Sequence, residues 1–196
     1  MPPPKEIRLV VGLGNPGEAY HETRHNVGFL VLDKVAETFS IAMDRRKFDV
    51  VMGRGLIGNH EVILAKPQAY MNRSGSPVLK LANYFRILCE EMLIVHDDID
   101  LSFGRIKIKD KGGHGGHNGL RSLIDAFGGV NFARLRVGIG RSRDFTVTDH
   151  VLGRFNASEN KVLDQIISTA RDAIVTILQK GTQEGMNTFN NRKVVT

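Results

Sequence analysis

Apolar and polar residues form blocks along the chain that predict strands and helices in alternation. An apolar run over 7–11 predicts a buried strand, and apolar positions at helical spacing over 27–39 predict a helix that packs on a sheet. Residues 47–65 are rich in valine and isoleucine and contain Gly58 and Asn59, a pair typical of the turn of a β-hairpin. The first third of the chain therefore supplies strands, a helix and a hairpin.

The same kind of pattern continues through the middle of the chain. A helix is predicted to begin at an N-cap, Ser76, and is followed by a short buried strand over 92–95 and by a strand over 105–109 in which isoleucines alternate with cations. A glycine-rich loop over 112–119 precedes a further helix, for which Asn118 is the candidate N-cap. Strands and helices thus keep alternating.

The last third of the chain predicts one more strand and a long helix. Over 132–139 the alternation places Arg134 and Arg136 on the outward face, where they form a second basic stripe. The long amphipathic helix is predicted to be capped by Ser158 and to end at Gly181.

This order of elements predicts an α/β fold, namely a single-domain three-layer sandwich with a mixed, largely parallel sheet and helices on both faces. No internal repeat or linker divides the sequence, so one domain is expected over 1–196. Asn15 and the segments 70–72 and 96–100 each follow a predicted strand. Because open α/β sheets bind ligands at the carboxyl ends of their strands, these polar segments are expected to meet at one rim.

Composition narrows the setting in which the protein works. Twenty-seven Lys and Arg against twenty-one Asp and Glu give a net charge of +6, which favours a polyanionic partner. A lone cysteine, Cys89, excludes an intramolecular disulfide and fits a reducing compartment. No uncharged apolar run approaches the roughly 18 residues of a membrane span, and residues 2–5 lack the features of a secretion signal. A cytoplasmic protein without a membrane segment is therefore expected.

Motifs of two other enzyme classes occur only in incomplete form. Gly12, Gly14 and Gly17 match the G-x-G-x-x-G of dinucleotide-binding proteins, but polar residues delay the next helix and no acid ends the following strand. Residues 140–144 approach the G-x-S-x-G of serine hydrolases but lack its last glycine. Cys89 has no local partner that would activate it, so a packing role is expected.

A metal site is the next alternative. Histidines and aspartates occur in pairs or clusters at spacings that metal ligands can have, namely His21 with His25, His114 with His117, and Asp97, Asp98 and Asp100. The glycine-rich loop is a flexible platform for ligands, and no cysteine accompanies the histidines. The sequence therefore favours a site without a metal or another cofactor.

A histidine, a carboxylate and several asparagines remain, and they suit hydrolysis of an activated acyl bond. A neutral imidazole takes a proton from water near pH 7, and a carboxylate on its other nitrogen fixes the tautomer. Amide groups such as that of Asn15 can donate to a developing oxyanion. Any one of these residues alone is more often a solvated side chain or a helix cap, so their combination carries the interpretation.

Taken together, these stretches resemble bacterial-type peptidyl-tRNA hydrolase. The matching segments keep the order of that family and span most of the chain: 12–17, 20–28, 70–75, 96–101, 112–121, 134–140 and 186–190. The resemblance implies hydrolysis of the ester that links a peptide to the 3′ ribose of tRNA, which releases free tRNA and peptide. It also implies a monomer that acts without a metal, without a membrane and without an obligate protein partner.

The resemblance also implies roles for individual residues. His25 is the expected general base and Asp97 its partner, whereas Asn15 lies at the reacting ester and helps to distinguish blocked from free aminoacyl-tRNA. Asn72 and Asn118 are expected to hold the peptide backbone and the 3′ end of the tRNA.

The remaining implied roles concern the walls of the site and the RNA. Tyr20 and Tyr70 line the cleft, and Lys109 and Arg136 bind the 5′ phosphate of the tRNA acceptor stem. The competing class is a non-catalytic RNA-binding module, which the basic stripes favour but which the lack of regularly placed aromatic residues disfavours.

Overall fold

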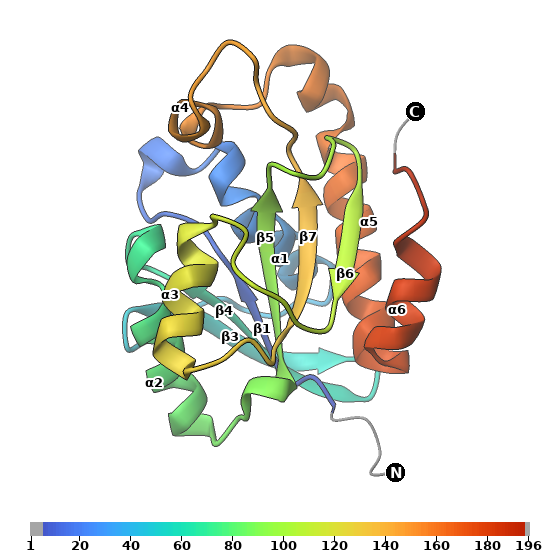
Figure 1. Cartoon of the computed structure of the whole chain (residues 1–196). Coiled ribbons are helices and arrows are strands. Elements are labelled where there is room, and N and C mark those ends of the chain that lie inside the picture. The colour runs from blue at the N-terminus through green and yellow to red at the C-terminus, as the bar shows by residue number, and fades with distance from the viewer. Residues whose placement is uncertain (1–5, 195–196) are drawn as a thin grey trace.

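The structure, a computed structural model, describes residues 6–194 and contains a seven-stranded sheet between two layers of helices (Figure 1). The strand order is β2-β3-β4-β1-β5-β7-β6, in which β4, β1, β5 and β7 are parallel and the other three strands are antiparallel to a neighbour. The strands are β1 (Leu9–Gly12), β2 (Arg45–Lys47), β3 (Val50–Ile57), β4 (His60–Pro67), β5 (Met92–Asp98), β6 (Ile106–Lys109) and β7 (Ala133–Gly138). The predicted mixed, largely parallel α/β sandwich is therefore confirmed.

The helices cover both faces of the sheet. On one face lie α1 (Val27–Thr38), α5 (Ala157–Lys180) and α6 (Thr182–Phe189), and on the other lie α2 (Gly75–Phe85) and α3 (Asn118–Phe127) (Figure 1). A short helix, α4 (Val147–Leu152), lies beyond the carboxyl ends of β5 and β7. Within residues 6–194, none of the helices combines the length and the apolar character that crossing a bilayer requires. The segment 2–5, which the sequence indicates is not a secretion signal, lies outside the described residues.

Two apolar clusters hold the three layers together. Along β1, Val10 faces the cluster beneath α1 and α5, whereas Leu9 and Val11 face the cluster beneath α2 and α3. All three side chains have no exposed surface, and burying an aliphatic side chain of this size stabilises a fold by about 1.5–3 kcal/mol. A strand that is apolar on both faces is what a central position in such a sheet requires.

Several element boundaries differ from the predicted ones. Strand β5 continues to Asp98, so Asp97 lies on the strand rather than in the loop after it. Helix α2 begins at Gly75 and does not use Ser76 as its N-cap, because Gly75 packs against α3 and donates its N–H to the Ser122 hydroxyl at 2.9 Å.

The long helix α5 also has a different N-cap from the predicted one. Its N-cap is Asn156, whose side chain accepts a hydrogen bond from the N–H of Glu159, and the Glu159 carboxylate accepts one from the N–H of Asn156. This reciprocal capping box satisfies two helix-end donors, which Ser158 alone could not do. The predicted end at Gly181 is confirmed.

A strand that the pattern did not predict lies at one edge of the sheet. Strand β2 pairs with β3, and the two are joined by a tight turn at Phe48 and Asp49, which have φ angles of 52° and 59°. Such positive φ angles are usual for glycine or asparagine and uncommon for a bulky residue such as phenylalanine. Three consecutive cations, followed by a turn without glycine, gave no alternation from which the strand could be recognised.

The opposite edge strand, β6, is covered by a side chain instead of a further strand. Asn190 accepts a hydrogen bond from the N–H of Ile108 at 2.7 Å and donates one to the carbonyl of Ile108 at 3.0 Å. Its amide therefore imitates the backbone of a neighbouring strand and ties the chain after α6 to the sheet.

Asn190→Ala is expected to lower the free energy of unfolding by about 1–3 kcal/mol, because it leaves a partly buried N–H and a carbonyl of the edge strand without these partners. A denaturant titration measures the loss. Asn187 is an exposed residue of α6 that bonds only to the side chain of Gln183, so Asn187→Ala should change the stability by less than about 0.5 kcal/mol. Equal stability of the two variants would contradict the edge-capping role.

Candidate active site

A cleft of about 460 Å³ opens at the carboxyl ends of β1 and β5. The three polar segments that follow β1, β4 and β5 meet there, as expected from the position of strand ends in an open sheet. All but one of the predicted site residues line this cleft, namely Asn15, His25, Tyr70, Asn72, Asp97, Lys109, Asn118 and Arg136. The remaining one, Tyr20, stands beside Tyr70 with the two rings in an edge-to-face arrangement and their centroids 6.5 Å apart.

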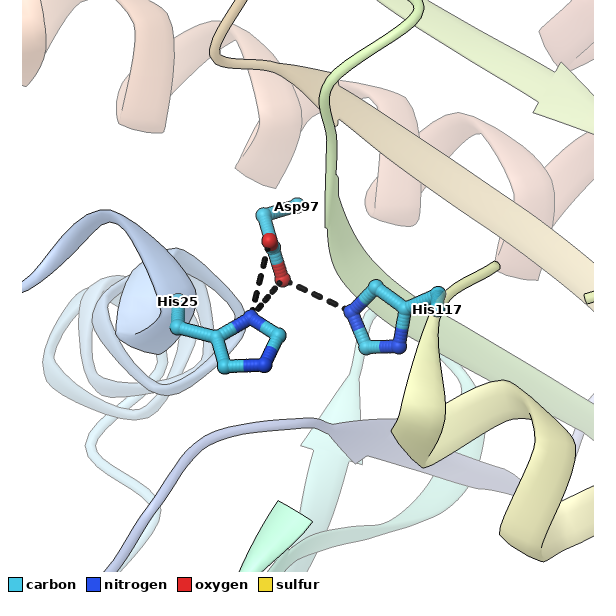
Figure 2. A group of neighbouring side chains, drawn as sticks. All are labelled: His25, Asp97 and His117. Atoms are coloured by element: carbon cyan, nitrogen blue, oxygen red, sulfur yellow. Dashed lines mark hydrogen bonds and ion pairs between the residues drawn. The ribbon is translucent and has the colours of Figure 1, made fainter. Parts of the chain in front are cut away.

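His25 and Asp97 both line the cleft, and their side chains face each other (Figure 2). His25 lies on the short helix η2 (Arg24–Asn26), and its Nδ1 is 3.0 Å from Oδ1 and 2.9 Å from Oδ2 of Asp97. Because a carboxylate only accepts hydrogen bonds, Nδ1 carries the ring proton. The Nε2 atom of His25 is then left with a free lone pair that can accept a proton.

Two glycines set how closely His25 approaches Asp97. Gly28 is the second residue of helix α1, and a Cβ at this position would lie 2.5 Å from the Val95 carbonyl oxygen and 2.6 Å from that of Leu13. A Cβ on Gly12 would in turn lie 2.4 Å from the carbonyl oxygen of Gly28. The start of α1 therefore rests directly on the ends of β1 and β5, which places the residues just before it above Asp97.

A second histidine shares the Asp97 carboxylate. Nε2 of His117 is 2.8 Å from Oδ1 of Asp97, and Nδ1 of His117 accepts hydrogen bonds from the N–H groups of Gly119 and Leu120 at 3.1 and 3.3 Å. His117, rather than the predicted Asn118, is thus the N-cap of α3. Since Nδ1 is an acceptor, the proton of this ring is on Nε2 and points at the carboxylate (Figure 2).

His25, Asp97 and His117 also meet the spacing of a metal site, since one ligand atom from each lies within 4.8 Å of the others. Ligation of a metal by Nε2 of His117 would require this nitrogen to lose its proton while Nδ1 remains occupied by two backbone N–H groups. The neutral ring has only one nitrogen without a proton, and the helix cap uses it. The hydrogen-bond pattern therefore suits a proton-transfer site better than a metal site.

The electrostatic environment keeps the carboxylate charged. Burial alone would raise the pKa of Asp97, but the imidazoles of His25 and His117 and their hydrogen bonds lower it well below the usual range. Burial alone would lower the pKa of His25, yet the charge and hydrogen bonds of Asp97 outweigh it and raise the pKa above the usual value. The neighbouring His96 has no such carboxylate partner, and burial lowers its pKa to about 3. His96 is therefore neutral, and His25 is the ring whose basicity the site increases.

Asn15 is held with one end of its amide turned to the cleft. Its Oδ1 accepts a hydrogen bond from the N–H of Met71 at 2.7 Å, and its backbone exchanges two hydrogen bonds of 2.9 Å with the side chain of Asn26. The amide oxygen is thereby fixed, and no residue of the described chain takes the hydrogens of Nδ2. Those two N–H bonds are available to an acceptor in the cleft.

Asn72, in η3 (Met71–Arg73), and Asn118, at the start of α3, are exposed residues that line the cleft. Tyr70 is 59% exposed and offers most of its ring to the solvent. These side chains are therefore accessible to a ligand, whereas His25, Asp97 and Asn15 are buried beneath them.

The two arginines of the second basic stripe have different partners. Arg136 pairs with Asp98 at 2.5 Å and, like Lys109, lines the cleft. Arg134 was predicted to face outward, but this is wrong, because it is 3% exposed and donates to the carbonyls of Gly112 and Gly113. The glycine-rich loop folds over Arg134 and supplies partners that no sequence pattern indicates.

Sequence reasoning also missed three features of the site. Helix α4 lines the cleft with Val147, Val151 and Leu152, but its six residues are too few to show a helical period. Arg24, next to His25, binds the Glu159 carboxylate at 2.7 Å and the His150 carbonyl at 3.3 Å, and these partners are more than 120 residues away in the chain. His117 was considered only as a metal ligand, although its place before a helix would have suggested a cap.

The other residues that the sequence suggests as metal ligands or as a nucleophile do not take part in the contact between His25 and Asp97. His21 is exposed, and His114 uses its Nδ1 to accept the N–H of Gly116 at 2.9 Å. Cys89 packs against the cluster beneath α2 and α3, and burial together with the nearby charge of Glu90 raises the pKa of its thiol. A raised pKa disfavours the reactive thiolate, in agreement with a packing role.

An α/β sheet that brings a histidine–aspartate pair and an amide donor together at its carboxyl edge has an arrangement that hydrolytic enzymes use. A family model described as peptidyl-tRNA hydrolase matches residues 9–196, and on this evidence the chain belongs to the peptidyl-tRNA hydrolase family. The predicted resemblance is thereby confirmed.

Relatives and solved structures agree with this assignment. The chain is 44% identical over 182 residues to a peptidyl-tRNA hydrolase of Clostridium perfringens, covering 93% of this chain and 96% of that protein. It is 45% identical over 187 residues to one of Syntrophotalea carbinolica, covering 95% and 98%. A crystal structure of peptidyl-tRNA hydrolase from Acinetobacter baumannii matches with a TM-score of 0.90 and 41% identity, over 96% of this chain and 97% of that one.

Proposed function

We propose that this protein hydrolyses the ester bond between a peptide and the 3′ ribose of tRNA, with His25 as general base and Asp97 as its partner. The observation that carries the proposal is the free Nε2 of His25 in the cleft, opposite the Nδ1 that Asp97 holds at 2.9 Å. Membership of the peptidyl-tRNA hydrolase family supports the choice of substrate.

In the proposed reaction, Nε2 of His25 takes a proton from water as the water oxygen adds to the ester carbonyl. Asp97 stabilises the imidazolium that forms, and a general base of this kind contributes about 10² to 10⁴ in rate. Nδ2 of Asn15 donates to the oxyanion, and one such donor contributes on the order of 10² to 10³. When the intermediate collapses, the C–O bond to the ribose breaks, and the imidazolium returns its proton to the ribose 3′ oxygen.

The exposed residues of the cleft are proposed to hold the two halves of the substrate. Asn72 and Asn118 bind the peptide backbone and the 3′ end, and Tyr20 and Tyr70 form the wall beside them. Asn15 also contributes to the distinction between blocked and free aminoacyl-tRNA, since it lies at the position proposed for the ester.

The setting follows from the substrate. Because peptidyl-tRNA arises in translation, the protein is proposed to work in the cytoplasm. We also propose that it acts as a monomer and without a metal, as the resemblance to the family implies. The lone Cys89 fits a reducing compartment.

Incubation with N-acetyl-aminoacyl-tRNA tests the proposal directly. Release of free tRNA and N-acetyl-amino acid is expected. The same rate is expected after a chelator has removed those divalent cations that the tRNA itself does not need. Tight binding without turnover would instead identify a non-catalytic RNA-binding protein, and loss of turnover with the chelator that returns with added metal would identify a metallohydrolase.

Lys109 and Arg136 are proposed to bind the 5′ phosphate of the acceptor stem. Lys109→Ala or Arg136→Ala should raise KM, and each should flatten the dependence of log K on log salt by about one unit per lost cation, because fewer counterions are released. Titration of tRNA binding between low and moderate salt measures the slope. Lys161→Ala removes an exposed cation of α5 that does not line the cleft, and it should leave the slope unchanged. The same slope in all three variants and the wild type would refute the phosphate clamp.

A further inference from the structure

A pair of exposed aromatic side chains lies at the turn between β2 and β3 and at the end of α2. Phe48 and Tyr84 are 39% and 57% exposed, and their ring centroids are 5.8 Å apart. Nζ of Lys47 lies 3.9 Å from the centroid of Tyr84 and 5.1 Å from that of Phe48. We name Lys47, Phe48 and Tyr84 the aromatic rim.

The aromatic rim is joined to the cleft by a short path along the backbone. The N–H of Gln68 donates to the carbonyl of Asp49 at 2.7 Å, and Gln68 is two residues from Tyr70, which lines the cleft. One residue spans at most about 3.6 Å of extended chain, so the backbone of Phe48 lies within roughly 15 Å of that of Tyr70. The turn that carries Phe48 is thus at the same end of the sheet as His25 and Asp97.

The backbone at Phe48 is strained in a way that exposes the ring. Phe48 and Asp49 both have positive φ, a conformation that is unfavourable for residues other than glycine, asparagine and aspartate. A short two-residue turn between β2 and β3 would be less strained with asparagine and glycine. Strain of this kind is typical of functional sites, and here it holds a phenylalanine at the surface beside Tyr84.

The sheet order places the aromatic rim on the opposite side of the reacting centre from the cations proposed to bind tRNA. Lys109 and Arg136 lie on β6 and β7, on one side of β5, whereas β4, β3 and β2 lie on the side of β1 that faces away from them (Figure 1). If the ester lies above Asp97 and the tRNA leaves over β7 and β6, the peptide leaves over Tyr70 toward β4 and β2. This direction rests on the proposed function.

We propose that the aromatic rim is a distal subsite for the peptide part of the substrate. At about 3.3 Å per extended residue, a peptide needs no more than roughly five residues beyond Tyr70 to reach Phe48. The rings offer stacking and apolar contact to aromatic side chains, and Lys47 offers a cation to carboxylates. Arg45 and Arg46, both exposed and with no ion pair to any residue in 6–194, add positive charge next to it. The subsite therefore selects peptides that carry aromatic and acidic side chains at this distance from the ester.

Two substrates of different length separate the subsite from the reacting centre. One is N-acetyl-aminoacyl-tRNA, and the other carries a peptide of about ten residues with phenylalanine and aspartate from the fifth residue onward. Tyr84→Ala keeps a good helix former in α2, and Phe48→Asn keeps a residue that tolerates positive φ. Each variant is expected to raise KM for the long substrate about threefold to tenfold, which is the range for loss of an aromatic contact, and to leave kcat/KM for the short substrate unchanged.

A matched control and four contrary outcomes complete the test. Leu56 is 62% exposed at the far end of β3, and Leu56→Ala should affect neither substrate. Equal losses on both substrates, or no loss on either, would overturn the subsite, and so would weaker binding of uncharged tRNA, which would identify an RNA surface. If sedimentation shows that the wild type is a dimer and that the two variants are not, the aromatic rim is an interface between copies of the chain instead. The wild type's turnover of the short substrate tests the proposed function separately, and if it is absent both proposals fail.

Discussion

Replacement of His25 by alanine is expected to lower kcat for N-acetyl-aminoacyl-tRNA by about 10² to 10⁴, because the ring is the only group proposed to take the proton from water. The affinity for tRNA should remain within about twofold, since Lys109 and Arg136 are untouched. Single-turnover release of tRNA measures the first quantity, and filter binding at fixed salt measures the second.

His21→Ala is the matched control for this experiment. His21 lies one residue beyond the short helix that precedes η2 and is exposed, so its loss should change neither rate nor affinity. Full activity of His25→Ala would end the proposed mechanism. A parallel loss of tRNA affinity in that variant would mean that His25 holds the substrate instead of activating water.

Asp97→Asn is expected to lower kcat by about 10² to 10⁴ for a different reason. Oδ1 of Asp97 accepts from His117 and Oδ2 accepts from His25, so an asparagine that keeps its oxygen toward His117 turns its N–H₂ group toward His25. His25 must then accept at Nδ1 and carry its proton on Nε2, where the water is to be activated. The wrong tautomer costs hydrolytic triads a factor of this order.

The pH dependence distinguishes this effect from simple misfolding. In the wild type, kcat/KM should rise with pH as the imidazolium of His25 loses its proton, with a midpoint above the usual histidine value of about 6.5, because Asp97 raises this pKa. In Asp97→Asn the charge is gone and burial lowers the pKa, so the midpoint of the residual activity should move to lower pH. A profile of kcat/KM between about pH 5 and 9 measures both.

Asp100→Asn removes a carboxylate three residues further on, which pairs with Arg141 at 2.6 Å rather than with His25. Its acid midpoint should stay where the wild type has it. A midpoint that is the same in Asp97→Asn and in the wild type would show that the titrating group is not His25.

The sequence predicted those parts of the site that depend on where strands end. Asn15 and the segment around Asp97 follow or end apolar strands, and a parallel sheet brings such ends together whatever the loops do. The roles of His25 and Asn118 came from the resemblance to a family and not from spacing, since a single histidine or asparagine in a loop has no pattern of its own.

The parts that could not be predicted depend on contacts between distant segments. The alternation over 132–139 correctly placed Leu135 and Val137 in the core, but it could not show that a glycine loop would cover Arg134. The choice of His117 over Asn118 as the cap depends on a ring nitrogen that is free only because the other nitrogen faces Asp97. Period and propensity describe one segment at a time and carry no information about such pairings.

The absence of two side chains, on Gly12 and Gly28, has a consequence for engineering this protein. Replacing glycine by alanine inside a helix commonly stabilises a protein by about 0.4–1 kcal/mol, and Gly28, at the second position of α1, is an obvious target for such a change. Here the added methyl group would meet two carbonyl oxygens and lift the helix from the sheet, and the imidazole three residues earlier would move with it. A thermostability screen that scores folding alone would reject this change as destabilising. If further substitutions relieved the clash, the screen would select a more stable protein in which His25 is misplaced.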